Sequence, residues 1–390
     1  MTTNRTTVED LRTTLVDQLI HEGVLTDSAW REVFATVHRG IFVPYFFLPC
    51  RGRPGWRLIE GDDEWRHGVY VDEALVIQLN GDDNAAQAAR WGQTVEGVPT
   101  SSSSAPGLMA AMLHSLEVTQ GMTVLEVGTG SGYNAALLAA RLSDKAVTSI
   151  ELDPALAQRA RIALTTAGYR PTVVAGDGAA GYSPNARYDR VIATVALPRV
   201  PVAYLEQTHP GSLILIPLSF AGRGGLMALL RRDQAGAASG AFLAQYGGFM
   251  AVRSVTEPAT PKIRPQLLDA AYPTQVPPDA LTDIHPAAFY LSLCCPYRYR
   301  TVGFTPDDNS TGLQTWGQAT DGSTFGLTTI DGTTYVAADG PLWDTLETAY
   351  AQWRALGQPS RDRFGVTANP ARQWVWLDHP DHVITELGEL

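Results

Sequence analysis

The sequence predicts an α/β fold, a doubly wound and mostly parallel sheet followed by a smaller C-terminal α+β domain. Apolar strand patterns alternate with helical patterns between residues 123 and 219, which is typical of a parallel sheet covered by helices. Residues 256–286 hold seven prolines, a density that indicates a linker or an extended arm. We therefore expect a first domain over residues 1–255, a linker over 256–286 and a second domain over 287–390.

Two amphipathic helices are expected before the sheet, over residues 8–22 and from Thr26-Asp27 to Arg39-Gly40. A loop-rich stretch follows up to Val69, and the polar segment from Asn80 to Thr100 is expected to be irregular.

The serine-rich run Thr100–Gly107 precedes a predicted helix over Leu108–Leu116, so its hydroxyls are expected at the N-cap and just before it. Such a run is either a flexible linker or an active-site loop. We favour the loop, because the run is short and lies immediately upstream of a glycine-rich turn.

The sheet and the segments after it follow from apolar period and turn signals. The expected elements are Val124–Val127, a helix to Leu142, Val147–Leu152, helix Ala155–Ala167, Thr172–Ala175, Asp189–Thr194, a short helix at Val202–Gln207, Leu213–Leu218, and closing strands Gly225–Arg231 and Phe242–Val252.

The C-terminal region has a different texture. Ala288–Leu293 and Tyr299–Gly303 are expected as strands, Asp331-Gly332 as the turn of a hairpin, and Gln373–Leu377 as a last strand. A helix that opens at Pro341 carries a tryptophan-rich face. That face either packs on a sheet, which we favour, or binds a peptide.

The glycine-rich turn follows the apolar strand that ends at Val127 and precedes a helix. Gly128, Gly130 and Gly132 allow backbone angles that a Cβ forbids and a close approach by a ligand. The helix start offers unpaired N–H groups. The dinucleotide fingerprint is G-x-G-x-x-G, whereas here the third glycine comes one residue early and follows Glu126. This spacing favours S-adenosylmethionine in a Rossmann-like sheet.

Two acidic residues lie at the ends of the next strands. Glu151 follows the second strand, where a doubly wound sheet places the carboxylate for the ribose hydroxyls. Asp177, in Gly176-Asp177-Gly178, follows the third strand and can accept from an adenine amino group. Taken singly, each feature is also an ordinary turn or a solvated residue, but the three in order predict a methyltransferase cofactor site.

Composition and charge exclude several classes of partner. The formal charge of −11, with no basic run, argues against nucleic acid. Cys50, Cys294 and Cys295 form neither a disulfide framework nor a metal spacing, and we expect them to be reduced and buried; no metal site is expected. The N-terminus lacks the apolar core of a signal peptide and no run is long enough to span a bilayer, so a cytoplasmic protein is expected.

From about residue 8 to residue 255 the chain resembles the protein-L-isoaspartate O-methyltransferase family. The segments that carry the resemblance are Leu11–Gly23, Ile41-Phe-Val-Pro44, Tyr70-x-Asp72-x-Ala74-Leu75, Ser104-Ala-Pro106, Leu125–Tyr133, Gly176-Asp-Gly178 with Gly181, Tyr188-Asp189, and Pro210-Gly211 to Pro217.

The resemblance implies a class I S-adenosylmethionine-dependent methyltransferase fold and assigns roles to individual residues. Ser103 and Ser104 would face the substrate carboxylate as catalytic residues, and Tyr70, Asp72, Thr194 and Val195 would bind the substrate. The implied cofactor-binding residues are Ser102, Glu126, Gly128, Thr129, Gly130, Ser131, Gly132, Glu151, Leu152, Asp177 and Gly178.

The chain departs from the family pattern in two places. The family loop resembles T-I-S-x-P-H-M, whereas this chain has Gly107 in place of the histidine. The repair enzymes also end near the close of the catalytic sheet. Both departures are similar to extended relatives that tailor ribosomal peptide natural products of the lanthipeptide and graspetide type, so the resemblance implies a modified precursor peptide as partner, bound in part by the C-terminal domain.

Three hypotheses follow for function. The first is methylation of one Asp in such a peptide, giving an ester that cyclises to succinimide and opens to isoaspartate. The second is repair of isoaspartate in damaged proteins. The third is a non-catalytic binding module, against which the intact Glu151, Asp177 and three glycines speak.

Overall fold

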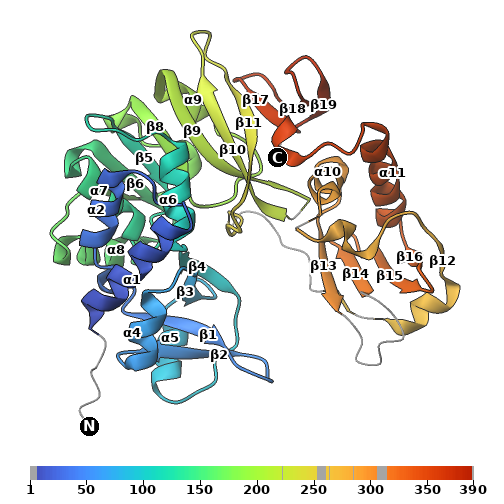
Figure 1. Cartoon of the computed structure of the whole chain (residues 1–390), viewed down its shortest axis with the longest axis horizontal. Coiled ribbons are helices and arrows are strands. Elements are labelled where there is room, and N and C mark those ends of the chain that lie inside the picture. Colours follow the sequence, from blue (N-terminus) through green and yellow to red (C-terminus); the bar gives the residue numbers. More distant parts are fainter. Residues whose placement is uncertain are drawn as a thin grey trace. The chain divides into compact units, whose positions relative to one another are not determined.

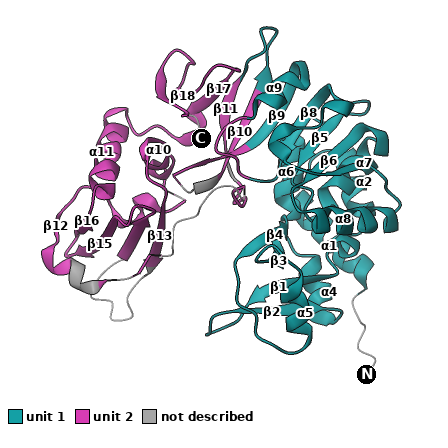
Figure 2. Ribbon diagram, turned by 180° about the vertical axis from the view of Figure 1, so that it is seen from behind, with its two compact units in different colours: residues 1–195, 201–216, 231–238 teal, residues 196–200, 217–230, 239–390 magenta. Residues whose placement is uncertain are grey.

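The computed structural model describes residues 7–221, 223–252, 261–262, 264–283, 285–304 and 314–388. The chain forms two compact units, shown in teal and magenta in Figure 2. Unit 1 comprises residues 1–195, 201–216 and 231–238. Unit 2 comprises residues 196–200, 217–230 and 239–390.

In unit 1 helices alternate with strands, which belong either to a parallel or to an antiparallel sheet (Figure 1). Its elements are α1 (Val8–His21), α2 (Ser28–Thr36), α3 (Arg39–Phe42), β1 (Tyr45–Pro49), β2 (Trp56–Glu60), α4 (Asp63–Val69), β3 (Leu75–Leu79), α5 (Asn84–Arg90), β4 (Pro99–Ser103), α6 (Pro106–Ser115), β5 (Val124–Val127), α7 (Tyr133–Arg141), β6 (Val147–Glu151), α8 (Pro154–Thr166), β7 (Thr172–Ala175), β8 (Tyr188–Ala193), α9 (Val202–Glu206) and β9 (Thr208–Phe220, as far as residue 216).

The central strands of unit 1 form a parallel sheet in the order β9-β8-β5-β6-β7. Strand β5 pairs in parallel with β6 on one side and with β8 on the other, and every residue of β5 and β6 is buried. Helices α7 and α8 each connect two parallel strands and cover the sheet. The sequences of β5 and β6 therefore do not alternate between apolar and polar residues. The predicted α/β fold is therefore confirmed.

A second, antiparallel sheet in unit 1 has the order β2-β1-β3-β4. It shows that two expectations were wrong: the stretch before Val69 is a hairpin of β1 and β2 followed by α4, and residues 80–100 include α5. The alanines of α5 are good helix formers, and Ala85 and Ala86 are buried in a small core with Phe47 and Leu79. Tertiary packing thus orders a segment whose composition is polar.

The serine run is a strand, β4, and not an irregular loop. It ends at Ser103, and α6 then begins at Pro106 after an N-cap, Ala105, that makes no side-chain hydrogen bond. The expected hydroxyl cap is therefore wrong. Its place is taken by Asp72, whose Oδ1 accepts from the backbone N–H of Gly107 at 2.6 Å.

Unit 2 begins with two long strands and continues with a helix-covered sheet. Its elements are β10 (Arg223–Arg232, as far as residue 230), β11 (Ala238–Tyr246, from residue 239), β12 (Tyr272–Pro273), α10 (Ala287–Cys294), β13 (Tyr299–Phe304), β14 (Gln314–Ala319), β15 (Thr324–Ile330), β16 (Thr333–Asp339), α11 (Leu342–Ala355), β17 (Phe364–Ala368), β18 (Gln373–Leu377) and β19 (Val383–Glu386).

The five-stranded antiparallel sheet of unit 2 has the order β12-β16-β15-β14-β13. The predicted hairpin is confirmed as β15 and β16, with Asp331 and Gly332 at positive φ in the turn. Helix α11 is confirmed too, and its Trp343 and Trp353 are buried, as expected for core residues.

Residues 288–293 form part of helix α10, so the predicted strand is wrong there. All residues from 287 to 293 are buried, and an apolar run that is buried on every side has no period that separates strand from helix.

The compact units do not follow the expected boundary at residue 255. Phe242 of β11 packs edge to face against Phe289 of α10 with ring centroids 4.9 Å apart, so β11 groups with the C-terminal region. Of the expected linker, residues 256–260, 263 and 284 lie outside the described residues. The part that is described includes β12, which pairs with β16, and the buried Val276.

The three cysteines are free thiols; Cys295 is buried, whereas Cys50 and Cys294 are half-buried. Among the described residues no helix is both long and apolar enough to cross a membrane.

Candidate functional site

The carboxyl ends of four neighbouring parallel strands bring the predicted cofactor residues together in unit 1. The glycine turn follows β5, Glu151 ends β6, Asp177 follows β7 and Thr194 follows β8. Strands β6 and β8 pair with β5 on its opposite sides. The order of the strands therefore reverses at β5, beside the glycine turn. In open α/β sheets ligands bind at such a switch point.

The glycine turn is shaped by contacts that leave no room for side chains. Gly128 has a φ of 96°, and a Cβ built on it would lie 2.7 Å from Thr194 Oγ1. That hydroxyl donates to Gly128 O at 2.7 Å and so holds the turn from below. Gly130 has a φ of 53°. The backbone of the turn is therefore bare, as a cofactor that binds against the main chain requires.

Glu151 connects the turn to the next loop. Its Oε2 accepts from Gly130 N at 2.8 Å, and its Oε1 accepts from Asp153 N at 3.1 Å. Each carboxylate oxygen has two lone-pair directions, so one on each oxygen is left for a ribose hydroxyl. The side chain is buried and oriented before any ligand arrives.

Glu126 lies beneath the turn rather than on its surface. It is fully buried, and its oxygens accept from Asn134 Nδ2 at 2.8 Å and from the hydroxyl of Ser149. Burial raises the pKa of Glu126 to about 7. The hydroxyl of Thr129 is hydrogen-bonded to Ser149 as well, at 2.6 Å. Glu126 and Thr129 thus support the turn from the interior, and Ser131 Oγ accepts from Tyr133 N at the start of α7.

The residues expected at the adenine end are more open. Asp177 is exposed, and its Oδ1 accepts from Ala179 N at 2.9 Å. Leu152 is 49% exposed, an unusual position for a large apolar side chain next to a buried carboxylate. A Cβ at Gly178 would lie 2.3 Å from Val127 Cγ1, so only glycine fits there.

Strand β4 lies directly against the glycine turn. A Cβ at Gly130 would be 3.3 Å from the carbonyl oxygen of Ser102 and 3.6 Å from Ser101 Oγ. Ser103 is 2% exposed, and its Oγ has no hydrogen-bond partner among the described residues. Ser104 is half-buried. The structure therefore places the serine run beside the glycine turn, and of its two candidate catalytic residues it buries Ser103 and leaves Ser104 half-buried.

Arg39 holds this part of β4 and has no local signature in the sequence, where it only marks the end of a predicted helix. Its guanidinium is fully buried and donates to Ser103 O at 3.2 Å and to Ser104 O at 3.0 Å. It also donates to the carbonyls of Val69, Val71 and Glu73. Burial lowers the pKa of Arg39 to about 10. This clamp fixes the backbone of the serine run.

The predicted substrate residues lie in two places. Tyr70 and Asp72 flank the clamp: Tyr70 Oη accepts from Gly40 N at 3.4 Å, and Asp72 accepts from Gly107 N. Thr194 is engaged with the glycine turn, and Val195, which follows it, is half-buried. Among the described residues no three His, Cys, Asp or Glu side chains are grouped to hold a metal ion.

The bare turn, the oriented carboxylate of Glu151 and the exposed Asp177 fit an adenosyl cofactor, since they offer backbone contact, a ribose acceptor and an adenine acceptor in that order along the sheet edge.

Comparisons with known proteins identify the family of this chain. Residues 61–244 match the family model described as Protein-L-isoaspartate(D-aspartate) O-methyltransferase (PCMT). A protein-L-isoaspartate O-methyltransferase of Ignicoccus hospitalis is 36% identical over 213 residues, which cover 54% of this chain and 83% of that protein.

One solved structure is similar in fold, and a second gives a weaker match. One, titled protein-L-isoaspartate O-methyltransferase, has a TM-score of 0.53 at 19% identity and covers 94% of this chain and 100% of its own. The other, from Plasmodium falciparum, has a TM-score of 0.43 at 13% identity, covers 63% of this chain and 99% of its own, and is titled as a complex of a putative protein-L-isoaspartate O-methyltransferase with S-adenosyl-L-homocysteine.

The coverage of the first structure overturns one expectation. Proteins with this title do not all end near the close of the catalytic sheet, because one of them aligns with 94% of this chain. The chain belongs to the protein-L-isoaspartate O-methyltransferase family and is an enzyme that uses S-adenosylmethionine as methyl donor.

Proposed function

We propose that this enzyme methylates the side-chain carboxyl group of one Asp in a ribosomally made, modified peptide. The ester then cyclises to a succinimide, which can open to isoaspartate. The observation that carries the proposal is the contact between Asp72 and Gly107, which lies next to the serine run.

This contact differs from the family pattern at Gly107, which stands in place of a histidine. A Cβ at Gly107 would lie 2.3 Å from Asp72 Oδ2, so a side chain at this position would displace the carboxylate of Asp72. The carboxylate of Asp72 fills the space and accepts from the N–H of Gly107. Asp72 belongs to the family pattern and Gly107 does not, so the surface beside the serine run differs in shape by the missing side chain at position 107, which supports a different acceptor.

The methyl transfer needs no acid or base catalysis by the side chains of the enzyme. An Asp carboxyl with a reference pKa of about 3.9 is already ionised at neutral pH, so no general base is needed. When bound, S-adenosylmethionine supplies an electrophilic methyl group. In the proposal Glu151 and the glycine turn hold its ribose end, Leu152 and Asp177 its adenine end, and Ser104 donates a hydrogen bond that orients the acceptor carboxylate.

The cyclisation that follows needs only the peptide itself. The backbone nitrogen of the next residue forms a bond to the ester carbonyl carbon, the bond from that carbon to the methoxy oxygen breaks, and the nitrogen's proton leaves with it as methanol. The methyl ester is required because methoxide is a better leaving group than the oxide of a free carboxylate.

We further propose that residues 288–390 help to select the peptide. Unit 2 contains a cavity of about 370 Å³ with an apolar floor that includes Leu226, Ala288 and Phe289. Its polar lining residues are Asp283, His285, Ser360, Arg361 and Asp362. The volume suits a large side chain of a bound peptide.

Filling this cavity tests the second proposal. Ala244 is exposed on β11 and lines the cavity, so Ala244→Phe should raise the KM for the peptide and leave cofactor affinity unchanged. Ala241→Phe, at an exposed position of the same strand that does not line the cavity, is the matched control. Equal KM values for the two variants would remove the selection role from this cavity.

Repair of L-isoaspartate in damaged proteins is the alternative. It is favoured by the printed name of the Ignicoccus relative and by the solved structure whose fold extends over most of this chain. In that case the C-terminal region does not serve to select a peptide for tailoring.

A pair of isomeric peptides separates the two. Each is a thioether-bridged ring with a single acidic residue, Asp in one and L-isoaspartate in the other, and methyl incorporation is followed by mass spectrometry with S-adenosylmethionine present. We expect kcat/KM to be higher for the Asp ring and a succinimide to follow. Methylation of the isoaspartyl ring alone would overturn the tailoring proposal in favour of repair.

A further inference from the structure

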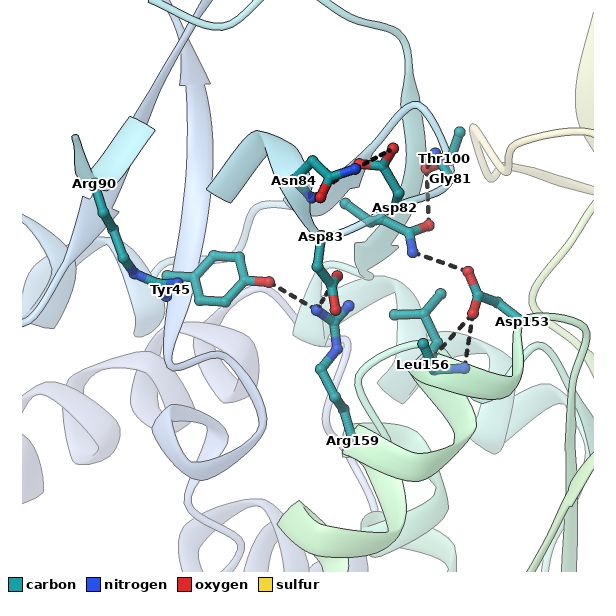
Figure 3. A network of polar contacts seen from close by, with 12 residues as sticks. Tyr45, Gly81, Asp82, Asp83, Asn84, Arg90, Thr100, Asp153, Leu156 and Arg159 are labelled. Atoms are coloured by element: carbon teal, nitrogen blue, oxygen red, sulfur yellow. Dashed lines mark hydrogen bonds and ion pairs between the residues drawn. The ribbon is translucent and has the colours of Figure 1, made fainter. Parts of the chain in front are cut away.

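A chain of hydrogen bonds in unit 1 runs from strand β4 to the loop that follows β6 (Figure 3). Thr100 Oγ1 donates to Gln78 Oε1 at 2.9 Å. Gln78 Nε2 donates to Asp153 Oδ2, also at 2.9 Å. Asp153 N donates to Glu151 Oε1 at 3.1 Å. The chain therefore ends on the carboxylate assigned to the cofactor ribose.

The direction of these bonds fixes the orientation of the Gln78 amide, with its oxygen toward Thr100 and its nitrogen toward Asp153. Thr100 Oγ1 accepts from the N–H of Gly81 at 2.9 Å and donates its own proton to Gln78. At the other end a carboxylate requires a donor, which only the amide NH₂ provides. Gln78 is 1% exposed and Asp153 is 8% exposed, so water does not substitute readily for either partner.

Asp153 is itself held firmly. Its Oδ1 accepts from Ala155 N at 2.9 Å and from Leu156 N at 3.3 Å, which caps the first turn of α8. Gln78 is thus attached to a rigid helix start that lies directly after Glu151. Two residues beyond Thr100 along β4, the carbonyl of Ser102 faces Gly130.

We propose that Gln78 is a positioning residue for methyl transfer: it sets the register between the serine strand β4, which holds the acceptor, and the ribose-binding end of β6. The inference rests on the proposed roles of Glu151 and Ser104. A small misplacement of reacting groups, on the order of 1 Å, can lower a rate about a hundredfold, so a bond that fixes this spacing affects turnover even though it touches neither ligand.

A second bridge shows that Gln78 is not needed merely to attach the antiparallel sheet. Arg159 of α8 donates to Tyr45 Oη of β1 at 2.8 Å and pairs with Asp83 at the start of α5 (Figure 3). This bridge is partly exposed and neither of its contacts involves Gln78, so we expect it to persist when Gln78 is changed. Loss of the Gln78 bond should therefore shift β4 locally rather than unfold the unit.

The test exchanges donor and acceptor in the full-length enzyme. Gln78→Glu places a carboxylate against Asp153, and we expect kcat to fall about tenfold or more while the Kd for S-adenosylmethionine changes less than threefold. Adding Asp153→Asn restores a donor opposite the new carboxylate and keeps an oxygen to cap α8, so the double variant should regain most of the kcat. Gln87→Glu, exposed on α5, adds the same charge without touching the chain.

Turnover is measured with whichever of the two ring peptides the enzyme methylates. The test of Gln78 can therefore be carried out even if the enzyme methylates isoaspartate and the tailoring proposal fails. An unchanged kcat in Gln78→Glu would overturn the positioning role. So would a double variant that recovers its thermal stability and not its kcat.

If Gln78→Glu does not fold, Thr100→Val and Thr100→Ser are compared instead. Only the serine variant keeps the hydroxyl that donates to Gln78. We expect a lower kcat in the valine variant alone, and equal kcat values in the two variants would overturn the role.

Discussion

Replacing Glu126 with Gln should make unit 1 less sensitive to pH. In the native protein burial raises the pKa of Glu126 from 4.5 to about 7. The unfolded chain therefore releases this proton near pH 4.5, whereas the native chain keeps it until about pH 7. Between these values the native state binds more protons, so the free energy of unfolding falls as pH rises.

The size of the effect follows from the same two values. At about 1.4 kcal/mol per pH unit, the native protein loses up to about 3 kcal/mol between pH 4.5 and pH 7 and no more above it. The amide that Glu126→Gln introduces is neutral throughout; its oxygen can accept from Asn134 and its NH₂ can donate to Ser149, which still reaches Thr129.

Hydrogen exchange of peptides from β5 and β6, followed by mass spectrometry, measures the opening of unit 1 apart from unit 2. We expect Glu126→Gln to gain protection relative to the native protein as pH rises from 5 to 8, after correction for intrinsic exchange rates. Glu206→Gln, at an exposed position of the same unit, should show no such trend. A constant difference between Glu126→Gln and native protein over this range would refute the argument, since it would mean that Glu126 ionises normally.

Three other changes test the sites in turn. Glu151→Ala should weaken S-adenosylmethionine binding by about 1.5–3 kcal/mol, the scale of hydrogen bonds to a charged group; calorimetry measures it, and an unchanged Kd would remove the ribose assignment. Ser104→Ala should lower kcat about tenfold or more without weakening cofactor binding, because the lost bond acts on the acceptor; normal turnover would leave the serine run with a structural role only. Phe289→Ala should destabilise unit 2 by about 3–5 kcal/mol, since its ring packs against those of Phe242 and Phe364 with centroids 4.9 Å apart. An unchanged midpoint of thermal unfolding would contradict that packing.

The features that could be predicted from the sequence are those that depend on local backbone geometry. The glycine turn is one example, because residues at 128, 130 and 132 must all reach positive φ within five positions. The hairpin at Asp331-Gly332 is another, since both central residues have the positive φ that its turn requires. Strands β5 and β6 belong with these, because a strand buried on both faces reads as an unbroken apolar run.

The features that were missed depend on partners far along the chain. Arg39 donates to carbonyls 30 to 65 residues away, and Gln78 reaches Asp153 across 75 residues. Neither side chain stands in a motif, and a polar residue in an apolar stretch is as readily solvated as buried. Helix α10 was missed for a related reason: its residues are buried on all sides, so nothing in their order distinguishes a helix from a strand.

The sequence by itself thus determined the fold class and the glycine turn, because turns, glycine angles and apolar periods are properties of neighbouring residues. Only the tertiary structure decided that the serine run is an edge strand held by Arg39 against the glycine turn, and that Asp72 takes the space beside Gly107. These arrangements arise where segments distant in sequence must satisfy each other's buried polar groups, and no local pattern records which partner each group will find.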